Sequence, residues 1–208
     1  MSIACKDRDK SIEYLKEVGF PFVIIGRPEY PEGMLWVDND NFQTTYNLVN
    51  ELIKKGYKDI AFLGAKKEWN VIKDRFKGFK AACQINGMPI QDKNFVIMSE
   101  FNEKEGIDGT VKLLENITPT AIIVEDDILA FGTLKVLHER NIKNIEVIGF
   151  NNNPLSEFQM PPLSSIDINA AELGYYAAKT LIDFLENNQI QRNHYIIESK
   201  IIKRESFK

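Results

Sequence analysis

The chain has 208 residues, 44% of them hydrophobic and 27% charged, and a formal net charge of −4. This composition is typical of one large globular domain or two small ones, and it excludes a disordered or fibrous chain. Acids and bases are interspersed, which argues against a nucleic-acid-binding surface on these residues, and no apolar run approaches the roughly 20 residues that span a bilayer.

Short β-branched runs alternate with longer segments of helical period from the start of the chain. In chain order, the expected strands are 22–25, 60–63, 95–98, 121–124, 147–150 and 195–202. The segments between them carry apolar faces at helical spacing, namely Phe42, Tyr46, Val49 and Ile53; Ile72, Phe76, Phe79 and Cys83; Ile107, Val111 and Leu114; Leu134 and Leu137; and Leu173, Ala177, Leu181 and Phe184. The repeated β-then-α order predicts an α/β fold with a parallel sheet.

The loops that follow the expected strands hold aromatic, amide, carboxylate and Arg side chains, without His or Cys. Ligands of open parallel sheets collect outside the carboxyl ends of the strands, so a site is expected in these loops. Their composition suits a polyhydroxy ligand better than a metal ion or a catalytic nucleophile, and we expect neither a metal nor a cofactor. Cys5 and Cys83 stand alone, and charges interrupt the first thirty residues, which indicates a reduced, cytoplasmic protein.

The run 121–124 ends at three consecutive acids, Glu125, Asp126 and Asp127. An acid at a helix N-terminus accepts hydrogen bonds from free backbone N–H groups, so at least one of them is expected to cap the following helix. Another could contact a ligand. Adjacent carboxylates diverge at a strand end, and no second acidic motif marks an opposite wall, so we do not expect glycosidase chemistry.

Two loop aromatics and one Arg are candidate ligand contacts. Trp69 and Phe101 lie outside the expected apolar faces; each could cover the local core or present its ring to a sugar. Arg75 could form a surface ion pair with Asp74, or it could direct its fork of donors into a cleft.

Motifs along nearly the whole chain resemble, in order, the lactose-repressor/galactose-repressor (LacI/GalR) family of bacterial transcription regulators. They are "VDNDN", "LIKKGYKDIAFLG", "DRFKGFKAAC", "PTAIIVEDDILAFGTLKVLHERNI", "VIGFNNN", "PPLSSIDIN", "ELGYYAAKTLIDFL" and "IIESKIIKRES". The segments "FVIIGRP" and "VIKDRFKGF" look most like the maltose-type repressors of that family.

This resemblance implies a periplasmic-binding-protein-like fold of two lobes with the effector held between them. It implies that residues 1–39 and 166–190 form an incomplete amino-terminal lobe, and that 40–165 and 193–208 form the carboxy-terminal lobe. The three crossings between lobes are expected at 38–40, 165–167 and 187–195. Family members begin with a DNA-reading helix-turn-helix, which this sequence does not contain.

The resemblance also implies the effector contacts. The family's effector-binding Arg falls on Arg75, its stacking aromatic on Phe101 and the first polar residue of its acidic motif on Asp126. Asp127 is then the helix cap, and Glu125 is solvated or paired. The family's "GFDD" is altered, so that an Asp that often contacts the ligand is here Asn151, and in the first lobe Arg27 is the expected polar contact. Trp69 as a sugar platform is our own interpretation.

The implied function is the effector-binding core of a transcriptional repressor that responds to maltose or a similar glucoside. The family also implies a homodimer. The apolar segment with Phe158, Met160 and Leu163 could contribute to the dimer interface, or it could instead pack within its own domain. We expect removal of Arg75 to weaken binding and to spare folding. A transport receptor and a glycoside-processing enzyme are the alternatives.

Overall fold

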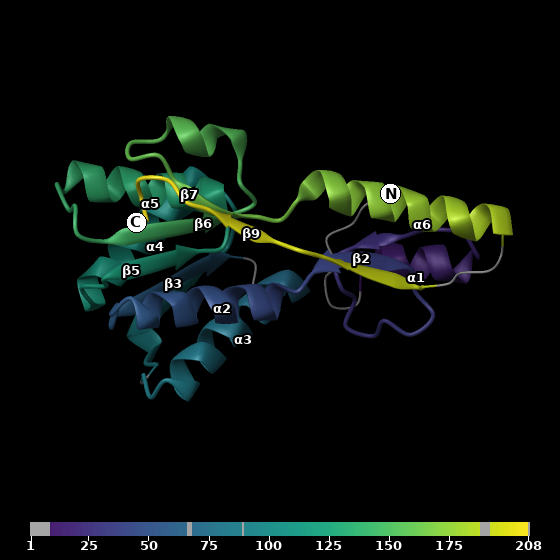
Figure 1. Ribbon diagram of the computed structural model, residues 1–208, viewed down its shortest axis with the longest axis horizontal. Helices are drawn as coiled ribbons and strands as arrows, with labels where there is room; N and C mark the ends of the chain where they lie inside the picture. Colours follow the sequence, from purple (N-terminus) through teal and green to yellow (C-terminus); the bar gives the residue numbers. More distant parts are fainter. Residues whose placement is uncertain (1–8, 66–67, 89, 188–191, 208) are drawn as a thin grey trace.

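The computed structural model describes residues 9–65, 68–88, 90–187 and 192–207, and in it strands and helices alternate along most of the chain (Figure 1). The strands are β1 (Ile24–Ile25), β2 (Trp36–Asn39), β3 (Ile60–Ala65), β4 (Phe95–Met98), β5 (Ala121–Val124), β6 (Glu146–Phe150), β7 (Ser164–Asp167), β8 (His194–Ile197) and β9 (Lys200–Ile202). The helices are α1 (Lys10–Glu17), α2 (Asn41–Lys54), α3 (Asn70–Ile85), α4 (Glu103–Asn116), α5 (Asp127–Glu139) and α6 (Ala170–Asn187), with short 3-10 helices η1 (Asp92–Asn94) and η2 (Pro154–Phe158).

The α/β prediction is confirmed, and the expected strands between 60 and 150 are present as β3 to β6. Two strands were not predicted, β2 with sequence WVDN and β7 with sequence SSID. Asn, Asp and Ser are uncommon in strands because their side chains compete for backbone hydrogen bonds. In β2 the polar residues Asp38 and Asn39 end the strand, whereas in β7 two Ser residues begin the strand and Asp167 ends it. The apolar alternation that marks a strand is therefore missing from both.

The larger sheet has the order β4-β3-β5-β6-β7-β9 and is parallel except for β9, which runs antiparallel to β7. Successive side chains of a strand point to opposite faces. Ile60 and Phe62 of β3 therefore join the core under α2 and α3, while Ala61 and Leu63 join the core under α4 and α5. We call this sheet with its four covering helices the large-sheet unit.

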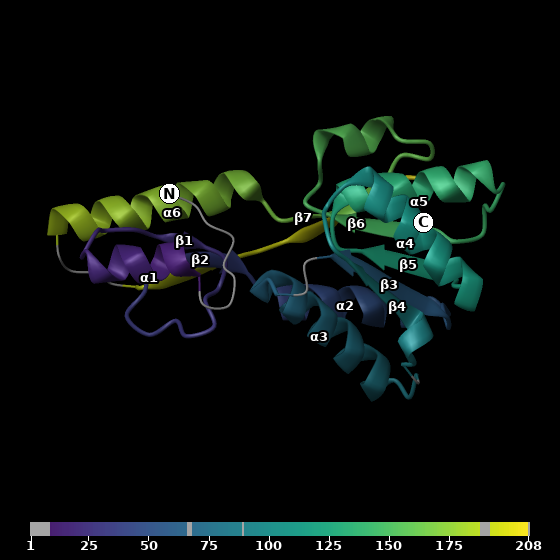
Figure 2. The same cartoon turned by 180° about the vertical axis from the view of Figure 1, so that it is seen from behind.

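The smaller sheet has the order β1-β2-β8 and is parallel. Val37 of β2 packs with Leu173 of α6 on one face, and Trp36 packs with Ile12 of α1 on the other. Figure 2 shows α6 lying along this sheet, at a distance from the larger sheet. We call β1, β2, β8, α1 and α6 the small-sheet unit.

The last expected strand, 195–202, is in fact two strands in two different sheets. β8 pairs with β2 in the smaller sheet, and β9 pairs with β7 in the larger one (Figure 1). The chain therefore crosses at 198–199 and not at 187–195, and residues 194–197 belong with the small-sheet unit. The apolar pattern continues through both strands, so the sequence does not mark the break.

One buried side chain bonds to all the crossings between the units. Asn39 is the last residue of β2, before the chain enters α2. Its Nδ2 donates to the carbonyl of Ile168, between β7 and α6, at 3.0 Å, and to the carbonyl of Ile197, at the end of β8, at 2.9 Å. Asn39 therefore holds three chain segments at one junction.

Replacing this amide should destabilise the fold. Asn39→Ala leaves two carbonyl groups without their donor, and we expect a loss of about 2 to 4 kcal/mol in the free energy of unfolding. Urea denaturation measures it. Asn47→Ala is the matched control, because Asn47 is exposed and bonds only to Gln43 in the described structure, so it should change stability by less than about 0.5 kcal/mol. Equal losses in both variants would contradict the role of Asn39.

Candidate functional site between the sheets

A cavity of about 260 Å³ lies between the two units, at the carboxyl ends of β1, β5 and β6. All six residues that the sequence predicts as ligand contacts line it: Arg27, Trp69, Arg75, Phe101, Asp126 and Asn151. They come from separate loops, which the parallel sheet brings to one edge. The cavity is also lined by Asp38, Asn41 and Glu125, which the sequence did not propose as contacts.

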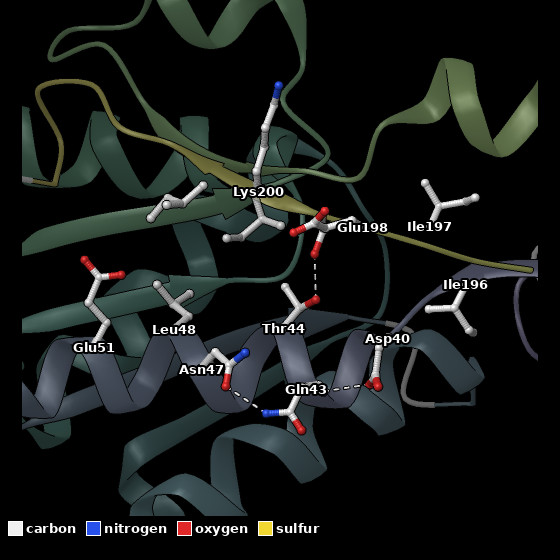
Figure 3. Close-up of a pocket in the computed structure, with 13 residues that line it drawn as sticks. Asp40, Gln43, Thr44, Asn47, Leu48, Glu51, Ile196, Ile197, Glu198 and Lys200 are labelled. Carbon is white, nitrogen blue, oxygen red and sulfur yellow. Dashed lines mark hydrogen bonds between the residues drawn. The ribbon is translucent and has the colours of Figure 1, made fainter.

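A second groove of about 430 Å³ lies between α2 and the β8–β9 crossing (Figure 3). Its polar side chains bond to one another: Thr44 Oγ1 lies 2.7 Å from Ser199 Oγ, and Gln43 Nε2 donates to Asn47 Oδ1 at 2.7 Å. The Lys200 side chain extends away from the groove in Figure 3. Because these groups already satisfy each other, the cavity between the sheets is the stronger candidate.

Arg75 is buried, with 4% of its surface exposed, and two of its three guanidinium nitrogens donate to protein acceptors. Nε donates to Asn41 Oδ1 at 2.9 Å, and Nη1 donates to the Glu125 carbonyl at 2.8 Å. The guanidinium carbon lies 4.1 Å from the centre of the Phe150 ring. Removing this side chain would leave buried acceptors unpaired, so the burial of Arg75 favours a loss of stability over the expected survival of folding.

Asp74 does not pair with Arg75. Its carboxylate accepts from Arg27 Nη2 at 2.6 Å and lies 3.6 Å from Lys77 Nζ. Arg27 lies in the loop after β1 and Asp74 in α3, so this ion pair joins the small-sheet unit to the large-sheet unit. The Arg27 guanidinium thus bonds to α3, and Arg27 also lines the cavity.

Asp126, not Asp127, caps α5. Asp126 Oδ1 accepts from the backbone N–H of Ile128 at 2.8 Å, and Oδ2 accepts from Asn151 Nδ2 at 2.8 Å. One carboxylate therefore both caps the helix and joins two cavity-lining residues. Burial raises its pKa, although these donors and Arg75 oppose the shift.

Asp127 turns away from the cavity and anchors the segment after β6. Its carboxylate accepts from the backbone N–H of Asn153 at 2.6 Å, from Ser165 Oγ at 2.7 Å and from Ser156 Oγ at 3.0 Å. Burial nevertheless raises the pKa of Asp127 to about 6. The expectation that Asp127 is the cap is therefore wrong, since this side chain is needed to hold η2 against the sheet.

Glu125 is not solvated, and within the residues that the structure describes it has no ion pair at short range, contrary to the expectation. Only 1% of its surface is exposed, and burial raises the pKa of its carboxyl well above the usual value. The sequence could not show this, because an acid at a strand end is ordinarily exposed.

The two predicted aromatics meet at the cavity. The rings of Trp69 and Phe101 are 5.7 Å apart with an interplanar angle of 62°, an edge-to-face pair. Both are partly exposed and line the cavity, and Phe101 also packs on the core under α4 and α5. Phe101 therefore covers the local core and borders the cavity, while contact of either ring with a sugar stays a prediction.

Asp38 and Asn41 connect the cavity to the crossing. Asp38 accepts from the backbone N–H of Arg27 at 2.8 Å and from Asn41 Nδ2 at 3.1 Å, and Asn41 in turn accepts from Arg75. The polar run "VDNDN" was the available signal for them, but it was used only as a family motif.

Among the described residues no helix is long and apolar enough to cross a membrane, and no group of three or more His, Cys, Asp or Glu side chains is placed to hold a metal ion.

Comparison with known proteins identifies the fold and its relatives. A family model described as a periplasmic binding protein-like domain matches residues 49–207. The HTH-type transcriptional regulator MalR of Staphylococcus xylosus is 30% identical over 206 residues, which cover 97% of this chain and 60% of MalR. The chain thus spans about three fifths of the length of this relative.

Solved structures of LacI-family regulators have the same fold as this chain. A LacI-type transcriptional regulator from Bacillus cereus subsp. cytotoxis superposes with a TM-score of 0.93 at 33% identity, covering 99% of this chain and 74% of that one. A LacI-family regulator from Enterococcus faecium with bound ribose has a TM-score of 0.84 at 25% identity, covering 99% and 78%.

The raised pKa of Asp127 predicts a pH-dependent stability. Its folded pKa of about 6 exceeds the ordinary value of 3.8, so from pH 4 to 6 the unfolded chain loses this proton first. The free energy of unfolding should therefore fall as pH rises through this window, by on the order of 2 to 3 kcal/mol.

Asn cannot titrate, so the variant Asp127→Asn lacks this pH dependence. The difference in free energy of unfolding, parent minus variant, should therefore fall by this amount between pH 4 and 7, as measured by urea denaturation. Asp183→Asn, which removes an exposed carboxylate on α6, is the control and should show no such fall. A pH-independent difference for Asp127→Asn would refute the shift.

Proposed function

This chain belongs to the LacI family and carries its periplasmic binding protein-like domain, and we propose that it is the effector-binding core of a transcriptional regulator. The effector would be a small sugar, maltose or a similar glucoside, held between the two units. The protein would act in the cytoplasm and would bind operator DNA through a helix-turn-helix that lies outside these residues. The two units would be its two lobes.

The observation that carries this proposal is the make-up of the cavity. Partly exposed aromatic rings lie beside buried carboxylate, amide and guanidinium groups, all at the junction of the two units. A sugar has apolar C–H faces that suit such rings and hydroxyl groups that suit such polar partners. A volume of about 260 Å³ is suited to a ligand of sugar size.

Binding without turnover is the simplest use of these carboxylates. Asp127 accepts three hydrogen bonds away from the cavity, and Asp126 is engaged with Ile128 and Asn151. Neither is placed as a free acid or nucleophile opposite the other. We therefore propose that chromogenic glucosides are bound and not hydrolysed.

The same geometry supports a mechanism of response. A ligand in the cavity would contact both units, which meet at the junction held by Asn39 and through the Arg27–Asp74 ion pair. It would favour the arrangement in which those contacts are made, and so would change the spacing of two DNA-reading heads in the intact protein. The size of this shift is limited by the difference in affinity for the two states.

The aromatic pair provides the test of sugar binding. We expect Trp69→Ala and Phe101→Ala each to weaken binding by about 1 to 1.5 kcal/mol, or roughly five- to tenfold, because each removes a ring face from the ligand. Calorimetric titration with maltose, glucose, cellobiose and ribose measures this. Phe20→Ala, an exposed aromatic of the small-sheet unit, is the control. No binding of any of these sugars by the parent, or unchanged affinity in both variants, would oppose the proposal.

We also propose a homodimer formed through the large-sheet unit. Phe158 and Met160 are 73% and 78% exposed, and Met160 borders a hollow of about 690 Å³ that Leu134 and Leu137 also line. Leu163 is fully buried and packs internally, so it is not part of this surface. Exposed apolar side chains beside a hollow with a partly apolar lining favour self-association.

Sedimentation at tens of micromolar should show a dimer for the parent and a monomer for Met160→Asp, since a charge in an apolar interface is unfavourable. Ile85→Asp changes a comparably exposed apolar residue on α3 and should leave the dimer intact. A monomeric parent at this concentration would remove the dimer from the proposal.

A further inference from the structure

Glu125 occupies a fixed position at the end of β5. Its backbone N–H donates to the Leu63 carbonyl at 2.9 Å, and its own carbonyl accepts from Arg75 Nη1 at 2.8 Å. The sheet and Arg75 therefore hold the backbone from two sides. The residue is almost completely buried and lines the cavity between the units.

The carboxylate of Glu125 has unused acceptors. Within the described part of the chain, neither Oε1 nor Oε2 has a hydrogen-bond partner of good geometry; the backbone N–H of Ala65 lies close but outside the usual distance and angle limits. The charge of Arg75 and the nearby N–H of Ala65 offset burial only in part, since the pKa of Glu125 stays well above its ordinary value. Burying a carboxylate in this way is unfavourable unless a hydrogen-bond donor pairs with its oxygens.

The adjacent strand leaves room for this carboxylate. At Gly64 of β3, a Cβ atom would overlap Glu125 Oε2. Any other residue at position 64 would displace the acid, because backbone and carboxylate are in contact there. Gly64 therefore leaves space for the buried carboxylate of a residue that lines the cavity.

The other acids of the cavity already have donors. Asp38 accepts from Arg27 N–H, Asn39 N–H and Asn41, and Asp126 accepts from Ile128 N–H and Asn151. The Arg27 guanidinium is bonded to Asp74, so among the described lining residues Arg75 is the cation buried at the cavity. Among the described residues that line the cavity, carboxylates outnumber cations, and the carboxylate oxygens without a donor are those of Glu125.

On the proposed function of sugar binding, we propose that Glu125 is a specificity-determining residue that accepts a hydrogen bond from a hydroxyl or ammonium group of the effector. It thereby selects neutral or amino sugars over phosphorylated or acidic ones. A hydrogen-bond donor of the ligand would satisfy the buried acid, whereas an anionic ligand would meet an excess of negative charge in the cavity.

The test is calorimetric titration of the 208-residue chain with maltose, glucose and glucosamine, and with maltose 6′-phosphate and glucose 6-phosphate. The parent should bind at least one unphosphorylated sugar roughly tenfold or more tightly than its phosphorylated form. Glu125→Gln should bind that sugar roughly tenfold more weakly and should discriminate less against the phosphate, because a charge-assisted hydrogen bond is lost.

Matched variants separate this effect from misfolding. Glu125→Ala should show the same loss of discrimination, and thermal melts without ligand should place Glu125→Gln at or above the parent, since it removes a buried charge. Glu103→Gln changes an exposed acid that pairs with Lys135, and it should bind like the parent.

Unchanged affinity and selectivity in Glu125→Gln, or a parent that prefers the phosphorylated sugars, would overturn the role of Glu125 and leave sugar binding standing. A parent that binds none of the probes would overturn both the proposed function and this inference.

Discussion

The burial of the Arg75 guanidinium is the constraint on which the site depends. A cation removed from water must be met by acceptors, and the chain supplies the Asn41 side chain, the Glu125 carbonyl and the face of Phe150. These groups come from α2, the end of β5 and β6. Holding one guanidinium therefore sets the relative positions of three segments around the cavity.

From Arg75 the polar contacts continue into the junction between the units. Asn41 bonds to Asp38, Asp38 accepts from the backbone of Arg27, and the next residue, Asn39, bonds to the other crossing segments. Residues of the cavity wall and of the junction are thus neighbours at the end of β2. A ligand that displaced any of these groups would act directly on the segments about which the two units are joined.

Asp126 and Asp127 divide two tasks at the end of another strand. Asp126 lies on the cavity and caps α5, while Asp127 holds Asn153, Ser156 and Ser165 behind it. The segment so anchored leads into the exposed side chains Phe158 and Met160. The cavity and the proposed dimer surface are therefore connected through adjacent residues, Asp126 and Asp127.

The sequence by itself determined the α/β order, the apolar helix faces and the loops in which a site should lie, because periodicity and the rule about strand ends depend on local spacing. The resemblance to the family added Arg75, Phe101, Asp126, Asn151 and Arg27 as contacts, and these residues line one cavity together with Trp69. Only the tertiary structure decided that β2 and β7 are strands, that 195–202 is divided between two sheets, that Arg27 turns to Asp74, and that Glu125 is buried. Each of these depends on partners distant in sequence, such as Ile168 and Ile197 for Asn39 or Gly64 for Glu125, and no local pattern encodes the direction in which a side chain at a strand end will turn.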